Sequence, residues 1–210
     1  MRRRINLLGV VGLLIAATCG EPARAQSSSR SQDVQVYVGE LFGDRLTGQP
    51  LSGSHPHLDD NATFGGRYTY HITDGWGLQL STAYSPSRAG RAPNGASDAA
   101  LTTVDFDLEW DIVPGFELLS RPLVPYTVVG MGYAWANVDH ANYGLTGGRA
   151  VMITDGDAFT ANVGFGARYY LKHSLFIDFD ARYRYLSKLV GDYGQGLNTA
   201  ETSLSLGYRF

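Results

Sequence analysis

The sequence predicts an all-β fold, an eight-stranded antiparallel up-and-down transmembrane β-barrel, and three observations lead to it. Apolar and polar residues alternate with a period of two in most of eight segments of about 9–15 residues, long enough for the ~9–11 that a tilted strand needs to cross a bilayer. The connections between these segments alternate between short and long. After residue 25, no apolar run reaches the ~20 residues of a membrane-spanning helix.

The N-terminus has the three parts of a signal peptide. Residues 2–4 are arginines, residues 7–18 are apolar, and Ala23-Arg24-Ala25 forms a cleavage site. A lipoprotein leader would instead make Cys19 the acylated first residue, but Thr18 is a poor residue before such a site. We therefore expect cleavage after Ala25, which removes the only cysteine and with it any disulfide or thiol chemistry.

Cleavage there divides the chain into three expected parts, which are the signal peptide (1–25), a disordered Ser-rich tail (26–32) and the barrel domain (33–210). The mature chain keeps 13 basic and 19 acidic residues, so its net charge is −6. No basic surface for nucleic acid is expected from this balance. The 26 glycines and 13 tyrosines favour strands over helices.

The expected strands cover residues 34–42, 62–72, 76–84, 101–112, 124–138, 158–171, 175–185 and 199–210. Segment 101–112 shows the clearest alternation, because Phe106, Leu108 and Trp110 are separated by acidic residues. Both faces of segment 124–138 are apolar, so its orientation stays open.

The connections complete the pattern of a barrel threaded up and down through the membrane. Residues 73–75 and 172–174 are short turns, and residues 113–123 are a link of moderate length. The remaining connections are long and rich in Gly, Ser, Asn and Asp, at residues 43–61, 85–100, 139–157 and 188–198. An even number of strands would return both chain ends to the periplasm.

The expected barrel is apolar outside and polar inside. In lipid every backbone amide must be bonded within the protein, so the last strand is expected to pair with the first. The charged residues expected in the lumen are Arg67, Asp105, Asp107, Glu109, Arg168, Asp178, Asp180, Arg182, Arg184, Glu201 and Arg209. Their charges nearly balance, and the interior of an eight-stranded barrel is just wide enough for side chains. We expect a plug of ion pairs without a continuous pore; the alternative is a gated ion path.

Aromatic residues are expected to form a girdle at the periplasmic interface, because they lie beside the short turns and the chain end. They are Tyr70, Trp76, Tyr126, Tyr169, Tyr208 and Phe210.

Four stretches carry a resemblance to a known family, at residues 65–80 (GGRYTYHITDGWGLQL), 124–135 (VPYTVVGMGYAW), 159–185 and 204–210 (LSLGYRF). In their order they resemble the small eight-stranded outer-membrane barrels, the group that contains the OmpA transmembrane domain and OmpX. The resemblance covers residues 33–210 apart from the long loops. It implies a monomer in the bacterial outer membrane, in contact with lipid and lipopolysaccharide. It also implies that the terminal strand, with Tyr208 and Phe210, is the signal read by the barrel-assembly machinery.

The sequence predicts neither catalytic activity nor a metal site. Some barrels of this size are lipid A acylases or deacylases, but the expected lipid-facing wall carries no Ser or His, and His173-Ser174 falls in a short turn. The loop stretch 54–60 (SHPHLDD) could bind a divalent metal, although its spacing matches no established site. No catalytic, metal or cofactor residue is assigned, and no cofactor is expected.

The function expected from the sequence is structural, or an interaction at the cell surface through the long loops. The first alternative is a small channel or transporter for small molecules. The second is a lipid A-modifying enzyme. A soluble ligand-binding barrel would need the apolar faces inside.

Overall fold

The computed structural model describes residues 31–43, 58–92, 95–112, 115–138, 141–146, 149–153, 155–187, 189 and 196–210. The expected signal peptide and residues 26–30 of the expected tail lie outside these ranges. In the described part of the chain, no helix has the length and apolarity required for a membrane span.

The described residues form eleven strands. They are β1 (Gln32–Phe42), β2 (Asn61–Thr73), β3 (Trp76–Ala92), β4 (Gly95–Asp111), β5 (Phe116–Leu118), β6 (Arg121–Val138), β7 (Ala141–Thr146), β8 (Arg149–Ile153), β9 (Gly156–Tyr170), β10 (Leu175–Leu186) and β11 (Leu197–Arg209). All their pairings are antiparallel.

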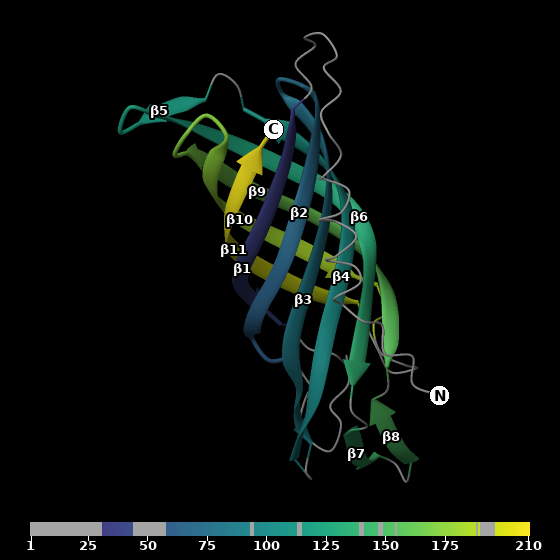
Figure 1. Cartoon of the computed structure of the whole chain (residues 1–210). Helices are drawn as coiled ribbons and strands as arrows, with labels where there is room; N and C mark the ends of the chain where they lie inside the picture. The colour runs from purple at the N-terminus through teal and green to yellow at the C-terminus, as the bar shows by residue number, and fades with distance from the viewer. Residues whose placement is uncertain are drawn as a thin grey trace.

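Eight of these strands close into the predicted barrel, in the order β1-β2-β3-β4-β6-β9-β10-β11 (Figure 1). The first and last strands seal it, because β1 pairs with β11 from Asp33↔Arg209 to Phe42↔Ala200. Two backbone hydrogen bonds extend this seam, from the Gln32 amide to the Phe210 carbonyl (3.0 Å) and from the Phe210 amide to the Gln32 carbonyl (2.9 Å). The prediction of an eight-stranded antiparallel barrel is confirmed.

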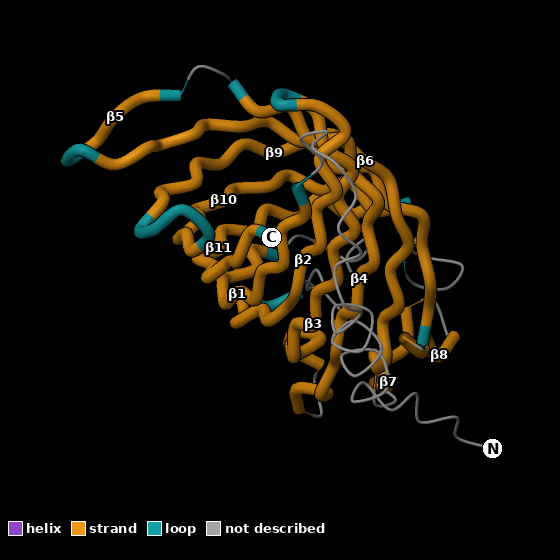
Figure 2. The backbone as a smooth tube through the Cα atoms, turned by 45° about the horizontal axis from the view of Figure 1, so that its top comes forward, coloured by secondary structure: helices purple, strands orange, loops and turns teal. Residues whose placement is uncertain are grey.

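The two ends of the barrel differ. The turn end carries the tight connections at residues 74–75 and 171–174, the β5–β6 hairpin and the C-terminus. At the opposite end, the loop end, lie the β7–β8 hairpin and the far ends of β3 and β4 (Figure 1). Figure 2, which brings the turn end forward, shows the strands as one curved wall, with β5 projecting from it.

The expected loop at residues 85–100 is wrong, because β3 and β4 continue as a paired ladder out to Ala92↔Gly95. The pairing of β3 with β2 ends at Tyr84. Pro86 therefore lies where β3 is paired on one side only, a position at which a sheet tolerates a residue without an amide hydrogen.

Two small hairpins were also missed. Residues 116–123 form the β5–β6 hairpin, whose tip residues Leu119 and Ser120 have φ of 51° and 60°. Positive φ at both tip residues matches the twist of a two-residue hairpin turn. The second hairpin, β7–β8, lies within the expected loop at residues 139–157.

The structure also decides the orientation of β6. Tyr126 and Val128 are buried inside the barrel, whereas Val129 and Met131 are exposed on its outer wall. Gly130 and Gly132 continue the inner face, opposite Asp107 and Asp105 in the register. An alanine at either position would place its Cβ on top of the facing carboxylate, so the inner face of β6 needs glycine there.

Candidate functional site: an ion-paired lumen

The charged residues of β4 point into the barrel. Asp105, Asp107 and Glu109 are each 0% exposed, whereas Phe106 between them is 55% exposed. Leu108 and Trp110 share the outer face with Phe106. Carboxylates buried in this way must be paired or hydrogen-bonded, so their partners define the contents of the lumen.

Seven of the expected lumen residues form a first cluster, the loop-side ion group, which consists of Arg67, Asp105, Asp107, Asp180, Arg182, Arg184 and Glu201. Its ion pairs are Arg67–Asp180 (3.0 Å), Arg67–Glu201 (3.9 Å), Arg182–Asp107 (2.6 Å), Arg182–Asp180 (2.8 Å), Arg184–Asp105 (2.7 Å) and Arg184–Glu201 (3.4 Å). Thr160 and Asn162 of β9 add hydrogen bonds of 2.8 Å to Asp105 and Asp107. The group thus joins strands from opposite sides of the barrel.

A second cluster, the turn-side ion group, consists of Asp33, His71, Glu109, Asp111, Arg168, Asp178 and Arg209. Its ion pairs include Arg168–Asp111 (3.0 Å), Arg168–Asp178 (3.6 Å), Arg209–Asp33 (2.7 Å) and His71–Asp33 (2.9 Å). Arg168 also pairs with Glu109. Arg209 is the most accessible member, with 27% of its side chain exposed.

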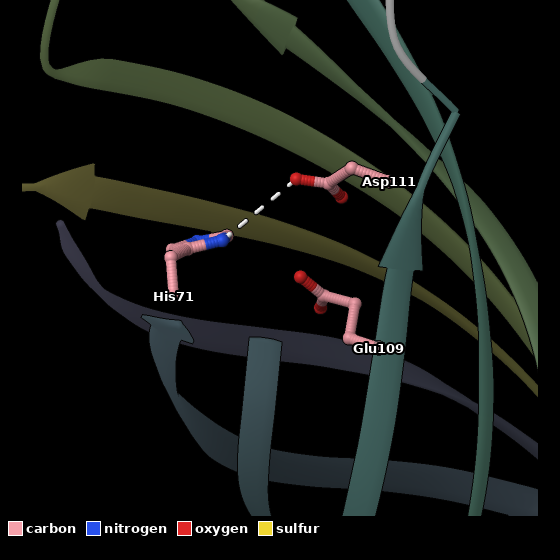
Figure 3. A group of neighbouring side chains, drawn as sticks. All are labelled: His71, Glu109 and Asp111. Atoms are coloured by element: carbon pink, nitrogen blue, oxygen red, sulfur yellow. Dashed lines mark ion pairs between the residues drawn. The ribbon is translucent and has the colours of Figure 1, made fainter. Parts of the chain in front are cut away.

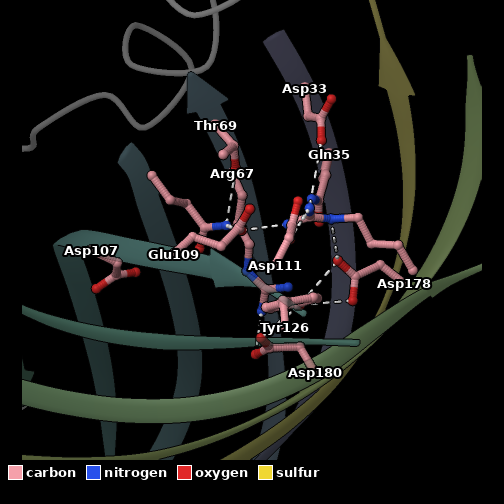
Figure 4. A network of polar contacts seen from close by, with 12 residues as sticks. Asp33, Gln35, Arg67, Thr69, Asp107, Glu109, Asp111, Tyr126, Asp178 and Asp180 are labelled. Carbon is pink, nitrogen blue, oxygen red and sulfur yellow. Dashed lines mark hydrogen bonds and ion pairs between the residues drawn. The ribbon is translucent and has the colours of Figure 1, made fainter. Parts of the chain in front are cut away.

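Tyr126 connects the two groups. Its hydroxyl lies 2.8 Å and 3.0 Å from the two carboxylate oxygens of Asp178, and 2.9 Å from Asp180 Oδ2 (Figure 4). Its ring lies beneath the Arg168 guanidinium, 4.5 Å from the guanidinium carbon to the ring centroid. The side chain is 1% exposed, so the expected place of Tyr126 in the aromatic girdle is wrong.

The remaining girdle residues are distributed as follows. Trp76, Tyr208 and Phe210 are exposed at the turn end, and Tyr70 and Tyr169 are half-buried. The rings of Tyr208 and Phe210 stack at a centroid distance of 6.4 Å, as do those of Trp76 and Trp110 at 6.0 Å.

An apolar cluster fills the interior toward the loop end, whereas the sequence predicts only charged residues for the lumen. Its members are Leu41, Leu58, Ala99, Leu101, Ala134, Ala136, Ala158, Leu186, Leu189 and Leu197. Leu58 and Leu189 come from the connections rather than from the barrel strands. This loop-end apolar cluster covers the ion groups from one side.

The sequence-based prediction does not include four residues of this network, which are Asp33, His71, Asp111 and the linking Tyr126. Asp111 continues the period of Asp105, Asp107 and Glu109 on β4 and can be found by extending it. Asp33 is one residue before the first expected strand, in phase with Gln35. His71 likewise continues the inward face of Arg67 and Thr69 on β2.

These additions change the charge of the lumen. Within the described ranges, eight carboxylates are buried against the four guanidiniums of Arg67, Arg168, Arg182 and Arg184, with Arg209 partly exposed as a fifth. The near balance expected from the sequence is therefore wrong. The excess is largest in the turn-side ion group, which has four carboxylates and two guanidiniums.

Other candidate residues lie apart from the lumen. His173 is exposed in the turn at residues 171–174. His55 and His57 of the loop stretch lie outside the described residues, and Asp60 accepts a hydrogen bond of 2.9 Å from the Gly43 amide.

A closed barrel with an apolar outer wall and an ion-paired interior defines an integral β-barrel protein of the bacterial outer membrane. Comparison with family models agrees, because the outer membrane protein beta-barrel domain matches residues 11–210. The chain belongs to this family. No curated protein matches the sequence.

The solved structures similar to the chain include three with TM-scores of 0.50 or more. Neisserial surface protein A is 17% identical with a TM-score of 0.59, and the match covers 85% of this chain and 97% of that one. Ail of Yersinia pestis is 18% identical with a TM-score of 0.52, covering 87% and 100%. OprG of Pseudomonas aeruginosa is 15% identical with a TM-score of 0.50, covering 86% and 97%. At these identities the likeness shows the fold alone.

Proposed function

We propose that this protein is a closed, non-conducting outer-membrane barrel that contributes to envelope structure or surface attachment through its loop end. The observation that carries the proposal is the filled interior. Two ion groups occupy the lumen, Tyr126 bridges them, and the loop-end apolar cluster covers them. Such a barrel has no role that depends on passage of ions, which leaves its outer surfaces to act.

The ion groups resist opening because their members depend on one another. Arg182 pairs with Asp107 of β4 and with Asp180 of its own strand, so displacing it would leave two buried carboxylates without a cation. Breaking a buried pair in this way costs about 3–5 kcal/mol. A gated path through the lumen would have to meet such a cost at each opening.

The long strands at the loop end support an interaction role. β3 and β4 have 17 residues each, and only ~9–11 are needed to cross the bilayer. Their paired ladder therefore continues beyond the membrane as a rigid hairpin, with β7–β8 at the same end (Figure 1). One of the similar structures is described as an attachment invasion locus protein, and attachment suits a barrel with this external hairpin.

The proposal includes the route to the membrane. Residues 1–25 direct export, and the terminal strand with Tyr208 and Phe210 is recognised by the barrel-assembly machinery. The folded protein is a monomer surrounded by lipid, with lipopolysaccharide on the outer side. No catalytic activity is proposed.

Planar-bilayer recording tests the closed lumen. We expect purified protein to give no stable conductance steps, because the two ion groups and the loop-end apolar cluster fill the lumen. Reproducible, ion-selective channels of the unaltered protein would contradict the proposal.

Surface attachment is tested by shortening the external hairpin. Residues 86–100 are replaced by Asn-Gly, which joins Ser85 to Leu101, a pair of the β3–β4 ladder, by a tight turn that keeps the register. Bacteria expressing this variant are compared with wild type for adhesion to epithelial cells. We expect adhesion to fall while the outer-membrane level is unchanged. The matched control replaces residues 172–173 at the turn end with Asn-Gly. Equal adhesion of all three strains would leave only the structural role.

The loop-end apolar cluster favours passage of small apolar molecules as a second candidate function. Leu41, Leu101 and Leu186 would contact a molecule that displaced Leu58 and Leu189. Uptake of a fluorescent apolar probe by cells carrying the protein, compared with cells carrying Leu101→Asp, separates this function from attachment.

A further inference from the structure

Three side chains of the turn-side ion group converge at one point of the lumen wall. His71 of β2, Glu109 and Asp111 of β4 offer ligand atoms that all lie within 4.8 Å of one another (Figure 3). All three residues are buried. The strand between them is β3, and in the register His71 faces Gly77, which faces Glu109.

Gly77 creates the space in which they meet. Two strand spacings of ~4.8 Å separate His71 from Glu109, and a side chain on β3 would stand between them. A Cβ at Gly77 would meet Thr69 Cγ2 at 2.8 Å and would lie 3.5 Å from both Glu109 Oε1 and His71 Nδ1. Both ligand atoms therefore border the position where a side chain is missing.

Each of the three residues uses one polar atom for support and turns the other toward this space. Glu109 Oε2 accepts a hydrogen bond of 2.8 Å from Gln79, whereas Glu109 Oε1 is buried without a hydrogen-bond partner. Asp111 Oδ1 pairs with Arg168 at 3.0 Å, and Asp111 Oδ2 lies 3.8 Å from His71 Nδ1. A buried carboxylate oxygen without a hydrogen-bond partner is a free acceptor, and a bound water or cation supplies the missing contact.

The second ring nitrogen of His71 has a carboxylate partner, as the second ring nitrogen of a metal-bound histidine usually does. His71 Nε2 lies 2.9 Å from Asp33 Oδ2 and 2.9 Å from Arg209 Nη2, and Arg209 pairs with the same carboxylate. In the tautomer that donates its Nε2 hydrogen to Asp33, the carboxylate fixes the ring and raises the basicity of Nδ1. Here that arrangement directs Nδ1 toward Glu109 and Asp111.

Charge gives an independent reason for a cation. The turn-side ion group has four carboxylates, while Arg168 and Arg209 supply two positive charges, so its formal charge is −2 with every carboxylate ionised and His71 neutral. A metal-bound histidine is neutral, and a divalent cation balances this charge completely. A histidinium would balance half of it.

We propose that His71, Glu109 and Asp111 bind a divalent transition metal through His71 Nδ1, Glu109 Oε1 and Asp111 Oδ2. One nitrogen and two carboxylate oxygens suit Zn²⁺ or Mn²⁺, whereas Ca²⁺ prefers ligands made only of oxygen. The metal reaches the site from the turn end, where Arg209 is partly exposed. It ties β2 to β4 across β3, independently of whether the barrel conducts or attaches.

The test is a titration of the full chain, purified from outer membranes in detergent and stripped with EDTA. We expect ZnCl₂ and MnCl₂ to bind at one saturable site, and CaCl₂ to bind at least tenfold more weakly. His71→Gln weakens Zn²⁺ binding about 100-fold and Asp33→Asn about tenfold, as losses of a ligand and of its supporting partner do. His173→Gln, the matched change at an exposed histidine, leaves binding unchanged.

Gly77→Ala tests the space between the ligands without removing any of them, because the added methyl group occupies that space and every proposed ligand is kept. We expect at least a tenfold loss of Zn²⁺ affinity, with folding checked by the mobility of unheated protein on SDS gels. If this variant does not fold, pulsed EPR of the Mn²⁺-loaded wild type replaces it and should show nitrogen coupling that His71→Gln removes. Absence of a saturable Zn²⁺ or Mn²⁺ site in the wild type, or equal affinity of wild type and His71→Gln, overturns the proposal.

Discussion

At the scale of single residues, the interior is a set of mutually dependent charges. Arg182 illustrates this, because its guanidinium contacts Asp107 at 2.6 Å, Asp180 at 2.8 Å and the side-chain carbonyl of Gln79. None of these groups reaches water. The free energy of the folded state therefore depends on each member having its partners, more than on the attraction within any one pair.

Arg182→Met is expected to lower the free energy of unfolding by about 3–5 kcal/mol, because two buried carboxylates lose a cation while most of the side-chain volume remains. Urea unfolding of the protein in lipid vesicles measures the change. Arg121→Met, at an exposed arginine of β6, serves as control and should change stability by less than ~0.5 kcal/mol. Equal effects of the two substitutions would show that the ion group carries no special stability.

At the scale of elements, each barrel strand separates two environments. β4 presents Phe106 and Leu108 to lipid and its acids to the lumen, so shifting its register by one residue would exchange the two sets. The register is thus fixed by both faces at once.

Phe106→Lys is expected to destabilise the barrel by about 2–4 kcal/mol, the range for a lysine on the lipid face near the middle of a bilayer. The same unfolding assay in vesicles measures it. Glu117→Lys in β5, an exposed change at the turn end, should cost no more than ~1 kcal/mol, the range for a charge near the interface. A lysine tolerated equally at both positions would be inconsistent with lipid around Phe106.

The sequence was sufficient to predict the strands within the membrane, but not their continuation beyond it. Inside the bilayer one face meets lipid and the other the lumen, so residues such as Val104 to Trp110 alternate strictly. Residues 85–100 continue the ladder of β3 and β4 past the last pair of β3 with β2, and this Ser-, Ala- and Gly-rich stretch does not alternate apolar with polar residues. The alternation rule therefore predicts a loop where the structure has a ladder.

The candidate site was also predicted only in part. Period two placed Asp105, Asp107 and Glu109 on one face, but it contains no information about which strand lies opposite them. For β6, Gly130 and Gly132 could have identified the inner face, because glycines at every second position leave room for large side chains from the facing strand. The convergence of His71 and Glu109 over Gly77 required the register of three strands.

At the scale of the whole molecule, closure depends on the seam between β1 and β11. Phe210 contributes to it through its backbone, which bonds to Gln32, while its ring stacks on Tyr208 outside. The backbone thus completes the ladder, and the ring is available for recognition during assembly.

Phe210→Ala is expected to reduce the amount of folded protein in the outer membrane several-fold, because the proposed assembly signal includes this ring. Protein refolded in detergent should keep its closed seam, because the backbone bonds to Gln32 remain. Immunoblots of unheated membrane samples measure the first quantity and resistance to protease the second. Trp76→Ala, at another exposed aromatic residue of the turn end, is the control. An equal loss in both variants would mean that Phe210 acts only as part of the girdle.

The acids and arginines of the lumen are divided unequally along the chain. Strands β1 to β4 supply five of the eight buried carboxylates and one arginine, Arg67, while Arg168, Arg182, Arg184 and Arg209 all come from β9 to β11. The inner face of the first half of the polypeptide therefore carries excess negative charge, and that of the second half carries most of the arginines. Neither half can pair its buried charges by itself during folding. A chain cut between β6 and β9 should therefore yield two fragments that are degraded when expressed singly and that form a stable barrel when expressed together.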